Sequence, residues 1–527
     1  MNTRNSKQST LALDATGLAC VLIAALSLRI WLFYGLVGSD DSHYAMRGLE
    51  VAAGAWLPSD YIGDLRYGMN LPIALSVLLF GHSEAVLSVW GLVCGLSEIA
   101  LVYVFALRAW GLRAALLSSL LLSVTPLAID AATNIWADQP FSFLLTASAL
   151  SLYWACSGTR ALPYVFSGAI LGLAAWVKPE PSVIFATVIA LLALVFSDRK
   201  KQALAFLALG AGAIVLANLL LFSIAFGDPL YYWKLGTRNL QTNFVGQIAP
   251  WGTHSPFFYF RLLFLDGRAF WLIPFLSIGG VIVALRRAKT DALNPGLFVI
   301  VWAAFLLCAF SFFVYSISPL RLVPKQTNYA LMFAAPLCLL GGVWLATASI
   351  RIRMPVLAIT VLGAITLTIL DRFEHDIRSW SHRLVIEFAR SAPDTTVYAS
   401  KQTIAMNRVF DLLGSKEANN LHPLAELRQA KVERPETRPS AGHVVLAFHP
   451  KWPEARKQSI SDLVTTDPAC VREVLSLSIT PDQTTRVALE AVAKLRSLLP
   501  PLIDKHLAFT DPLLTPAPLR FFELSCH

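Results

Sequence analysis

Long apolar runs dominate this chain and limit it to one broad class of fold. Hydrophobic residues make up 56% of the 527 positions, and the mean hydropathy is +0.58, above the usual values for a soluble domain. The excess is gathered into stretches near the roughly 20 residues that an α-helix needs to cross a bilayer. We therefore predict a polytopic α-helical membrane protein with about eleven transmembrane helices. These are expected at 15–37, 84–107, 112–129, 139–156, 162–177, 181–197, 203–226, 270–285, 296–317, 328–348 and 354–370.

Basic residues between these stretches fall on one predicted side of the membrane. Because short cytoplasmic loops collect Lys and Arg, this bias predicts a cytoplasmic N-terminus, an extracytoplasmic C-terminal tail and a place in the inner (plasma) membrane. It also accounts for most of the net charge of +9, so no nucleic-acid partner is implied. The residues are Arg4, Lys7, Arg108, Arg113, Arg160, Arg199, Lys200, Lys201, Arg286, Arg287, Lys289, Arg351 and Arg353.

Two regions are predicted from this pattern. Residues 1–370 would form the transmembrane domain, with outer loops at 38–83 and 227–269 that are candidates for amphipathic surface helices. Residues 371–527 are more charged, with strand-like runs at 396–398 and 443–448 and helix-like runs near 376–390 and 484–498. They are predicted to form a small soluble α/β domain. In an oxidising compartment Cys470 and Cys526 of this tail would form a disulfide, the alternative being two free thiols.

An acidic pair, Asp40 and Asp41, directly follows the first apolar stretch. On a helix their side chains would point about 100° apart, so one could face a cavity while the other holds a loop or a metal. Packed together in a partly dry pocket, they would make one carboxylate a usable general base. The alternative is a solvated helix N-terminus, where acidic residues meet the positive end of the dipole. Spacing alone does not choose between these.

Three cations are expected near the outer membrane surface. Lys178 stands in Lys178-Pro179-Glu180-Pro181, where the prolines break the helix and leave a lysine that can hold a phosphate. The alternative is an interfacial anchor paired with Glu180. Arg321 and Lys325 precede the tenth stretch on the side that the positive-inside bias disfavours. This exception favours anion binding.

The remaining polar groups are less specific. Asp138 opens a predicted helix, where a cap is the plain interpretation. His43, His82 and His254 show no metal-ligand spacing, so metal dependence stays open, and no cofactor is certain. The sequence has no phosphate-cradling glycine loop, nucleophile elbow or nucleotide fingerprint.

With these residues the chain resembles the integral-membrane glycosyltransferases of the GT-C class, of glycosyltransferase family 39 type, especially the branch of protein O-mannosyltransferases and lipid A aminoarabinose transferases. The resemblance covers most of 15–370. It rests on Asp40, Asp41 and Tyr44 with the downstream Ala45, Gly54 and Trp56, on the Lys178-Pro179 break, and on Tyr329 in the proline-bearing outer helix that includes Pro336. Asn328 stands where that family usually has Arg, so Arg321 or Lys325 would supply the cation.

The resemblance implies transfer of a sugar from a polyprenyl-phosphate donor to a lipid, glycan or protein acceptor on the outer face, with inversion. Asp40 would act as the base, with Asp41 positioning it, binding an acceptor or holding a divalent ion. The donor phosphate would bind Lys178, Arg321 or Lys325, and the substrates would contact Tyr44, Asp138, Glu180 and Tyr329.

Two other functions compete with a transferase. A transporter or flippase would move a lipid-linked sugar without chemistry, but such proteins often carry internal repeats and charges at mid-membrane depth, and neither feature is evident. A membrane-anchored assembly factor would leave the acidic pair unexplained.

Overall fold

The computed structural model describes residues 2–55, 58–59, 61–240, 255–287, 293–318, 320–323, 325–424, 426, 444–450, 452, 471–498 and 507–524. The chain forms two compact units. The first consists of Met1–Phe33, Gly54–Ile73 and Ser88–Thr368, and the second of Tyr34–Ala53, Ala74–Leu87 and Ile369–His527.

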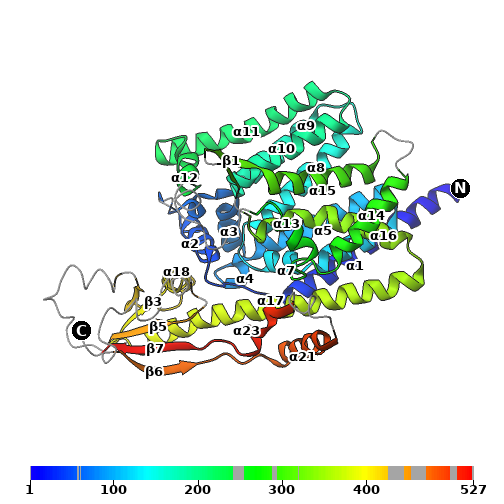
Figure 1. Cartoon of the computed structure of the whole chain (residues 1–527). Helices are drawn as coiled ribbons and strands as arrows, with labels where there is room; N and C mark the ends of the chain where they lie inside the picture. The colour runs from blue at the N-terminus through cyan, green and yellow to red at the C-terminus, as the bar shows by residue number, and fades with distance from the viewer. Residues whose placement is uncertain are drawn as a thin grey trace. The chain divides into compact units, whose positions relative to one another are not determined.

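The first unit is a bundle of helices with one short hairpin (Figure 1). Helices α3 (Tyr67–Phe80) and α17 (Ile350–Ser391) begin in this unit and end in the second. The other elements of the bundle are α1 (Asn2–Trp31), η1 (Ile62–Leu65), α5 (Val89–Trp110), α6 (Leu112–Val124), α7 (Pro126–Thr133), α8 (Asp138–Cys156), α9 (Leu162–Val177), α10 (Pro179–Phe196), α11 (Lys200–Phe226), α12 (Tyr231–Leu240), α13 (Phe258–Phe264), α14 (Ile273–Arg287), α15 (Pro295–Phe312), β1 (Val314–Ile317), β2 (Leu320–Leu322), η3 (Asn328–Phe333) and α16 (Ala334–Thr347).

All eleven predicted stretches are helical over most of their length. Within the described residues, seven helices are long and apolar enough to span a bilayer, or eight if the α6–α7 pair, bent by 63° at Thr125, counts as one span. The stretches at 139–156, 162–177 and 270–285 are helical but shorter or more polar than this criterion requires. The eleventh helix, α17, does not end at 370 but continues to Ser391, because its amphipathic second half packs within the second unit.

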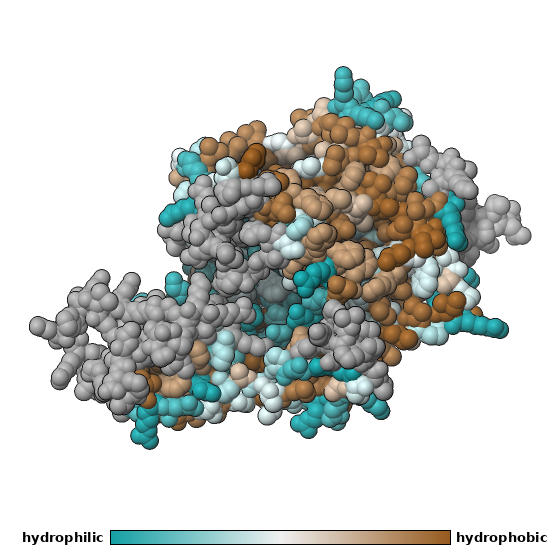
Figure 2. Space-filling model, in the orientation of Figure 1, coloured by the Kyte–Doolittle hydropathy of each residue, from teal (hydrophilic) through white to brown (hydrophobic). Residues whose placement is uncertain are grey.

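On the face shown in Figure 2, apolar side chains gather over the helical bundle. On α11, Leu216, Leu220 and Ile224 are all more than half exposed. A protein in water would bury such a surface, whereas lipid is as apolar as these side chains. The chain is a multi-pass membrane protein.

Glycines allow α9 and α11 to pack backbone to backbone. A Cβ at Gly168 would come within 2.1 Å of the Leu207 carbonyl oxygen, and one at Gly210 within 2.0 Å of the Val165 carbonyl oxygen. Small residues at such crossings are typical of membrane helices, which associate by close packing. This crossing fixes α9, whose end carries Lys178.

The second unit combines helices with a mixed sheet. Its five strands have the order β4-β3-β5-β7-β6, with β3 parallel to β4 and β5, and β7 antiparallel to β5 and β6. The elements are α2 (Asp40–Ala52), α4 (Glu84–Leu87), β3 (Thr396–Ala399), α18 (Lys401–Leu412), β4 (Leu421–Pro423), β5 (Val444–Phe448), β6 (Val471–Leu477), α21 (Gln483–Leu498), η5 (Ala508–Thr510), α23 (Asp511–Leu514) and β7 (Leu519–Leu524).

Two apolar clusters hold this unit together. One face of the sheet buries Leu424, Val444, Leu446, Phe448, Phe522 and Leu524. A second cluster packs Leu370, Phe373 and Ile377 of α17 against Leu489 and Val492 of α21. The predicted strand at 396–398 and the predicted helices at 376–390 and 484–498 are confirmed, and so is the strand predicted at 443–448 over its described residues 444–448.

Cys470 and Cys526 lie outside the described residues, so the predicted disulfide between them stays a prediction. In the described part of the chain, the cysteines Cys20, Cys94, Cys156, Cys308 and Cys338 are free thiols.

Substituting Gly210 by Ala tests the α9–α11 crossing. The new Cβ would overlap the backbone of α9, which neither helix can relieve by a rotamer change, and overpacking of this kind costs about 1–3 kcal/mol. Gly212 on the same helix meets nothing within 4 Å, so Gly212→Ala is the matched control. We expect a lower thermal unfolding temperature in detergent for Gly210→Ala only, and equal unfolding temperatures would contradict this packing.

Candidate functional site

The two adjacent acids are the first two residues of helix α2, yet their environments differ. Asp40 is exposed, whereas Asp41 is fully buried. The Asp41 carboxylate accepts hydrogen bonds from the backbone N–H groups of Val37 (2.5 Å), Gly38 (3.2 Å) and Ser39, and from the Ser39 hydroxyl (3.0 Å). Asp41 therefore folds the preceding loop back onto the helix start.

This arrangement separates the roles of the pair. Four donors occupy the lone pairs of the Asp41 carboxylate, so it is a structural acceptor in the described chain. Asp40 stands in the first turn of α2, at the positive end of the helix dipole, where acidic residues are commonly found. Asp41 thus holds a loop, as one predicted arrangement has it, and Asp40 lies exposed at a helix N-terminus, as the alternative has it. The role of general base stays a prediction.

Tyr44, one turn further along α2, is only 2% exposed. On the same helix Arg47 donates to Glu50 at 3.0 Å. These residues, with Asp40 and Asp41, belong to the second unit, whereas the other predicted site residues belong to the first.

In the first unit a buried ion pair joins three helix ends. The Lys178 ammonium lies 2.6 Å from one oxygen of Asp138, and the Asn328 amide donates to the other oxygen at 3.2 Å. Lys178 is the single residue between α9 and α10, Asp138 is the first residue of α8, and Asn328 is the first residue of η3. The ammonium also lies 5.1 Å from the centre of the Tyr329 ring, a cation–π geometry.

Two interpretations from the sequence are corrected here. Asp138 is not a helix cap: its carboxylate bonds to side chains, and the N-cap position of α8 is Ala137. Lys178 is not an anchor paired with Glu180, because its partner is Asp138 and Glu180 lies 3.7 Å from Arg66 instead. The predicted break at the prolines is confirmed, since α9 ends at Val177 and α10 begins at Pro179.

A third buried carboxylate fixes the orientation of α8. Glu98 on α5 accepts hydrogen bonds from Gln139 (2.7 Å), Ser142 (2.9 Å) and Thr146 (2.8 Å), all on α8. Ionisable groups at membrane depth are costly unless they are fully bonded. This network therefore locks the helix turn that carries Asp138.

Lys325 differs from Lys178 in having no partner among the residues that the structure describes. Its side chain is 1% exposed, and its ammonium makes no hydrogen bond to any described residue. Burial lowers the pKa of Lys325 to about 8, because desolvation disfavours the charged form. A buried lysine whose ammonium has no counter-ion among the described residues is a candidate site for an anion.

The residue after Lys325 is held by Tyr259 of α13. The Tyr259 hydroxyl donates to the Gln326 carbonyl oxygen and accepts from the Gln326 N–H, both at 3.4 Å. Burial raises the pKa of Tyr259, which keeps the hydroxyl protonated. Arg321 lies in β2, but its side chain is outside the described part of the structure.

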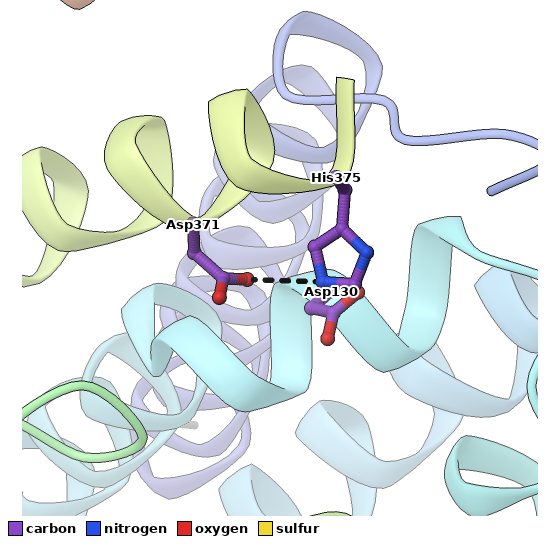
Figure 3. Close-up of side chains that lie close together, drawn as sticks. All are labelled: Asp130, Asp371 and His375. Carbon is purple, nitrogen blue, oxygen red and sulfur yellow. Dashed lines mark ion pairs between the residues drawn. The ribbon is translucent and has the colours of Figure 1, made fainter. Parts of the chain in front are cut away.

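A carboxylate–imidazole pair lies on α17 (Figure 3). His375 Nε2 is 3.8 Å from Asp371 Oδ2, and the Tyr34 hydroxyl donates to the same oxygen at 3.0 Å. The Tyr34 ring also meets the His375 ring edge to face at 5.3 Å. Asp130, the third residue drawn, is on α7 of the first unit.

Sequence reasoning missed Arg66, Glu98 and the amide of Asn328 as parts of these networks. A signal existed for the first two: Arg66 is a cation in a predicted outer loop, and Glu98 is a lone carboxylate within an apolar stretch. Nothing in the sequence marks Asn328 as a partner of Asp138, because the two are 190 positions apart.

Comparisons with known proteins agree with this architecture. Residues 68–224 match the family described as dolichyl-phosphate-mannose-protein mannosyltransferase. The chain is 26% identical over 377 residues to undecaprenyl phosphate-alpha-4-amino-4-deoxy-L-arabinose arabinosyl transferase 2 of Proteus mirabilis. That similarity covers 68% of this chain and spans 63% of the length of the relative.

Two solved structures share the fold. The first is ArnT from Cupriavidus metallidurans bound to undecaprenyl phosphate, with a TM-score of 0.54 and 16% identity over 83% of this chain and 94% of that one. The second is the Archaeoglobus fulgidus oligosaccharyltransferase in its apo form, with a TM-score of 0.55 and 11% identity over 97% and 88% of the two chains. The predicted resemblance to GT-C glycosyltransferases of the mannosyltransferase and aminoarabinose transferase type is confirmed.

Removing one member of the buried Lys178–Asp138 ion pair tests how much the pair contributes to stability. Lys178→Met leaves Asp138 buried without its cation, a change that typically costs about 3–5 kcal/mol. The double variant Lys178→Met/Asp138→Leu removes both charges, so we expect it to recover most of the loss. The measurement is thermal unfolding in detergent. A single variant as stable as wild type would show that the pair does not hold the three helix ends.

Proposed function

We propose that this protein transfers a sugar from a polyprenyl-phosphate donor to an acceptor on the outer face of the membrane. The similarity to a named arabinosyl transferase and the fold shared with ArnT bound to undecaprenyl phosphate support this proposal. The observation that carries it is the acidic pair, in which the buried Asp41 organises a loop and the adjacent Asp40 is presented at the surface.

Asp40 acts as the general base. It takes the proton of an acceptor hydroxyl as that oxygen forms a bond to the anomeric carbon of the sugar. The bond between that carbon and the phosphate oxygen breaks in the same step, and its electron pair leaves with the phosphate. A single displacement of this kind inverts the anomeric centre. Positioned bases of this type typically contribute about 10²–10⁴-fold to a rate.

Lys325 holds the departing lipid phosphate. Its ammonium is buried and unpaired among the described residues, so a phosphate would supply the missing counter-ion and regain the desolvation cost. Lys178 contributes less to phosphate binding, because the negative charge of Asp138 already compensates its positive charge. Arg321 is a further candidate on the strand before Lys325.

The other residues predicted to contact substrate differ in how exposed they are. Tyr329 and Glu180 are partly exposed and would contact substrate, with Tyr329 oriented by Lys178 below its ring. Asp138 would act through Lys178, and the buried Tyr44 would support α2. A divalent ion near the acidic pair is compatible with this scheme but is not needed for it.

For the location and orientation of the protein we keep the predictions made from the sequence. We place the protein in the inner membrane, with a cytoplasmic N-terminus, a membrane domain over 1–370 and an extracytoplasmic domain over 371–527. The acceptor is a lipid, glycan or protein group that presents a hydroxyl on that outer side.

Asp40→Asn tests the base directly. The amide keeps the size of the carboxylate but accepts no proton, so we expect transfer to fall by about 10²–10⁴-fold while binding of undecaprenyl phosphate is retained. The assay follows a radiolabelled sugar from the polyprenyl pool into separately extracted lipid, glycan and protein fractions. Label in one fraction with wild type only would identify the acceptor class. Equal labelling by variant and wild type would remove Asp40 from the mechanism.

The pH dependence of lipid-phosphate binding tests Lys325. Its pKa of about 8 in the free protein means that the ammonium is charged below this pH and loses its proton as the pH rises through it. Affinity for undecaprenyl phosphate should therefore decline above pH 8. Lys325→Arg, which stays charged, should keep its affinity there, and Lys325→Gln should bind weakly throughout. Identical pH profiles for all three proteins would contradict the assignment.

A further inference from the structure

One face of helix α17 contacts the loop that precedes Asp40. Ser379, His382 and Arg383 are spaced three and four residues apart, so they lie on the same side of the helix. All three belong to the second unit, as do the loop and helix α2. None of these contacts involves a residue that the proposed reaction uses directly.

Two of these residues hold the backbone of Leu36. The Ser379 hydroxyl donates to the Leu36 carbonyl oxygen at 2.7 Å, and the Leu36 N–H donates to Glu84 Oε1 at 2.7 Å. Arg383 completes the ring: it donates to the same Glu84 oxygen at 2.6 Å and to the Ser379 hydroxyl at 3.0 Å. Both backbone groups of Leu36 are therefore bound through α17, directly or by way of Glu84.

The third residue packs against Gly38. This glycine has φ of +83°, a conformation that residues with side chains rarely adopt. A Cβ there would come within 2.4 Å of the His382 ring and within 2.9 Å of the Met406 sulfur. The loop backbone thus lies directly on the imidazole, and only glycine fits between them.

His382 is itself rigidly supported. Its Nδ1 lies 2.8 Å from the Thr403 hydroxyl, and its ring stacks on Trp452 at 5.3 Å with only 6° between the planes. The Trp452 indole in turn donates to the Ser381 hydroxyl at 3.0 Å. Because Thr403 and Trp452 restrict the His382 imidazole, the loop packs against a side chain with a fixed position.

We propose that Ser379, His382 and Arg383 form a clamp on the loop 36–39 and thereby position Asp40. This inference rests on the proposed role of Asp40 as the base. Asp41 fixes the loop to α2 from one side and the clamp fixes it to α17 from the other, so the direction of the Asp40 side chain is set by both. The C-terminal region, which supplies Thr403 and Trp452, then has a positioning role in the reaction.

The test compares Ser379→Ala and Arg383→Gln with Glu387→Gln, an exposed site on the same helix. For the two clamp variants we expect backbone amides of residues 36–41 to exchange with deuterium about tenfold faster, because local opening becomes easier. A misplaced base should lower kcat by about 10–100-fold with little change in the KM for the lipid-phosphate donor. Arg383→Lys should restore part of the activity, and Glu387→Gln should match wild type.

Two results would overturn the clamp. Unchanged exchange at 36–41 would show that α17 does not hold the loop. Faster exchange with an unchanged kcat would show that holding it does not position Asp40. If wild type itself transferred no sugar, the proposed function would fail, while the exchange rates would still decide whether the loop is held.

Discussion

The buried carboxylate of Asp138 is the contact on which the arrangement of the first unit depends. It joins Lys178 at the break between two helices to Asn328 at the start of another. A charge without water around it is tolerated only when its partners are in place. The need to satisfy the Asp138 carboxylate therefore fixes each of these helix ends. Lys178 also places Tyr329, whose ring lies against its ammonium.

Three of the buried acids of this protein are satisfied in three different ways, and the acid next to one of them is exposed. Asp138 has a cation, Glu98 has an amide and two hydroxyls, and Asp41 has three backbone N–H groups and a hydroxyl. Asp40 is exposed. The two adjacent acids are thus chemically identical, but their environments differ: Asp41 is bonded to the loop, and Asp40 is free of such a structural role, as the proposed base must be.

Local constraints explain why much of the fold was predictable. A backbone within lipid must satisfy its own hydrogen bonds, so apolar runs of sufficient length become helices whatever their neighbours are, and prolines at 179 and 181 mark a break wherever they stand. The hairpin of β1 and β2 was missed because β1 falls at the end of the stretch 296–317, which was predicted as one helix. Short apolar runs do not distinguish strand from helix.

The site was less predictable, because its partners are distant in sequence. The spacing of Asp40 and Asp41 indicates that they diverge but not which one is buried, since that depends on the loop before them and on α17, more than 300 positions away. The pairing of Lys178 with Asp138 rather than with Glu180 depends likewise on how α8 approaches α10. The residues themselves predicted only the kinds of group involved, an acidic pair and several cations.

The two sets of contacts that helix α17 makes fix the number of residues between them. The helix packs Phe373 and Ile377 against α21 and presents Ser379 and His382 to the loop before Asp40. One residue inserted between these two sets would rotate one against the other by about 100°, and seven would restore the angle but separate them by about 10 Å along the axis. No insertion there preserves both contacts, so this segment of the chain can change its side chains but not its number of residues.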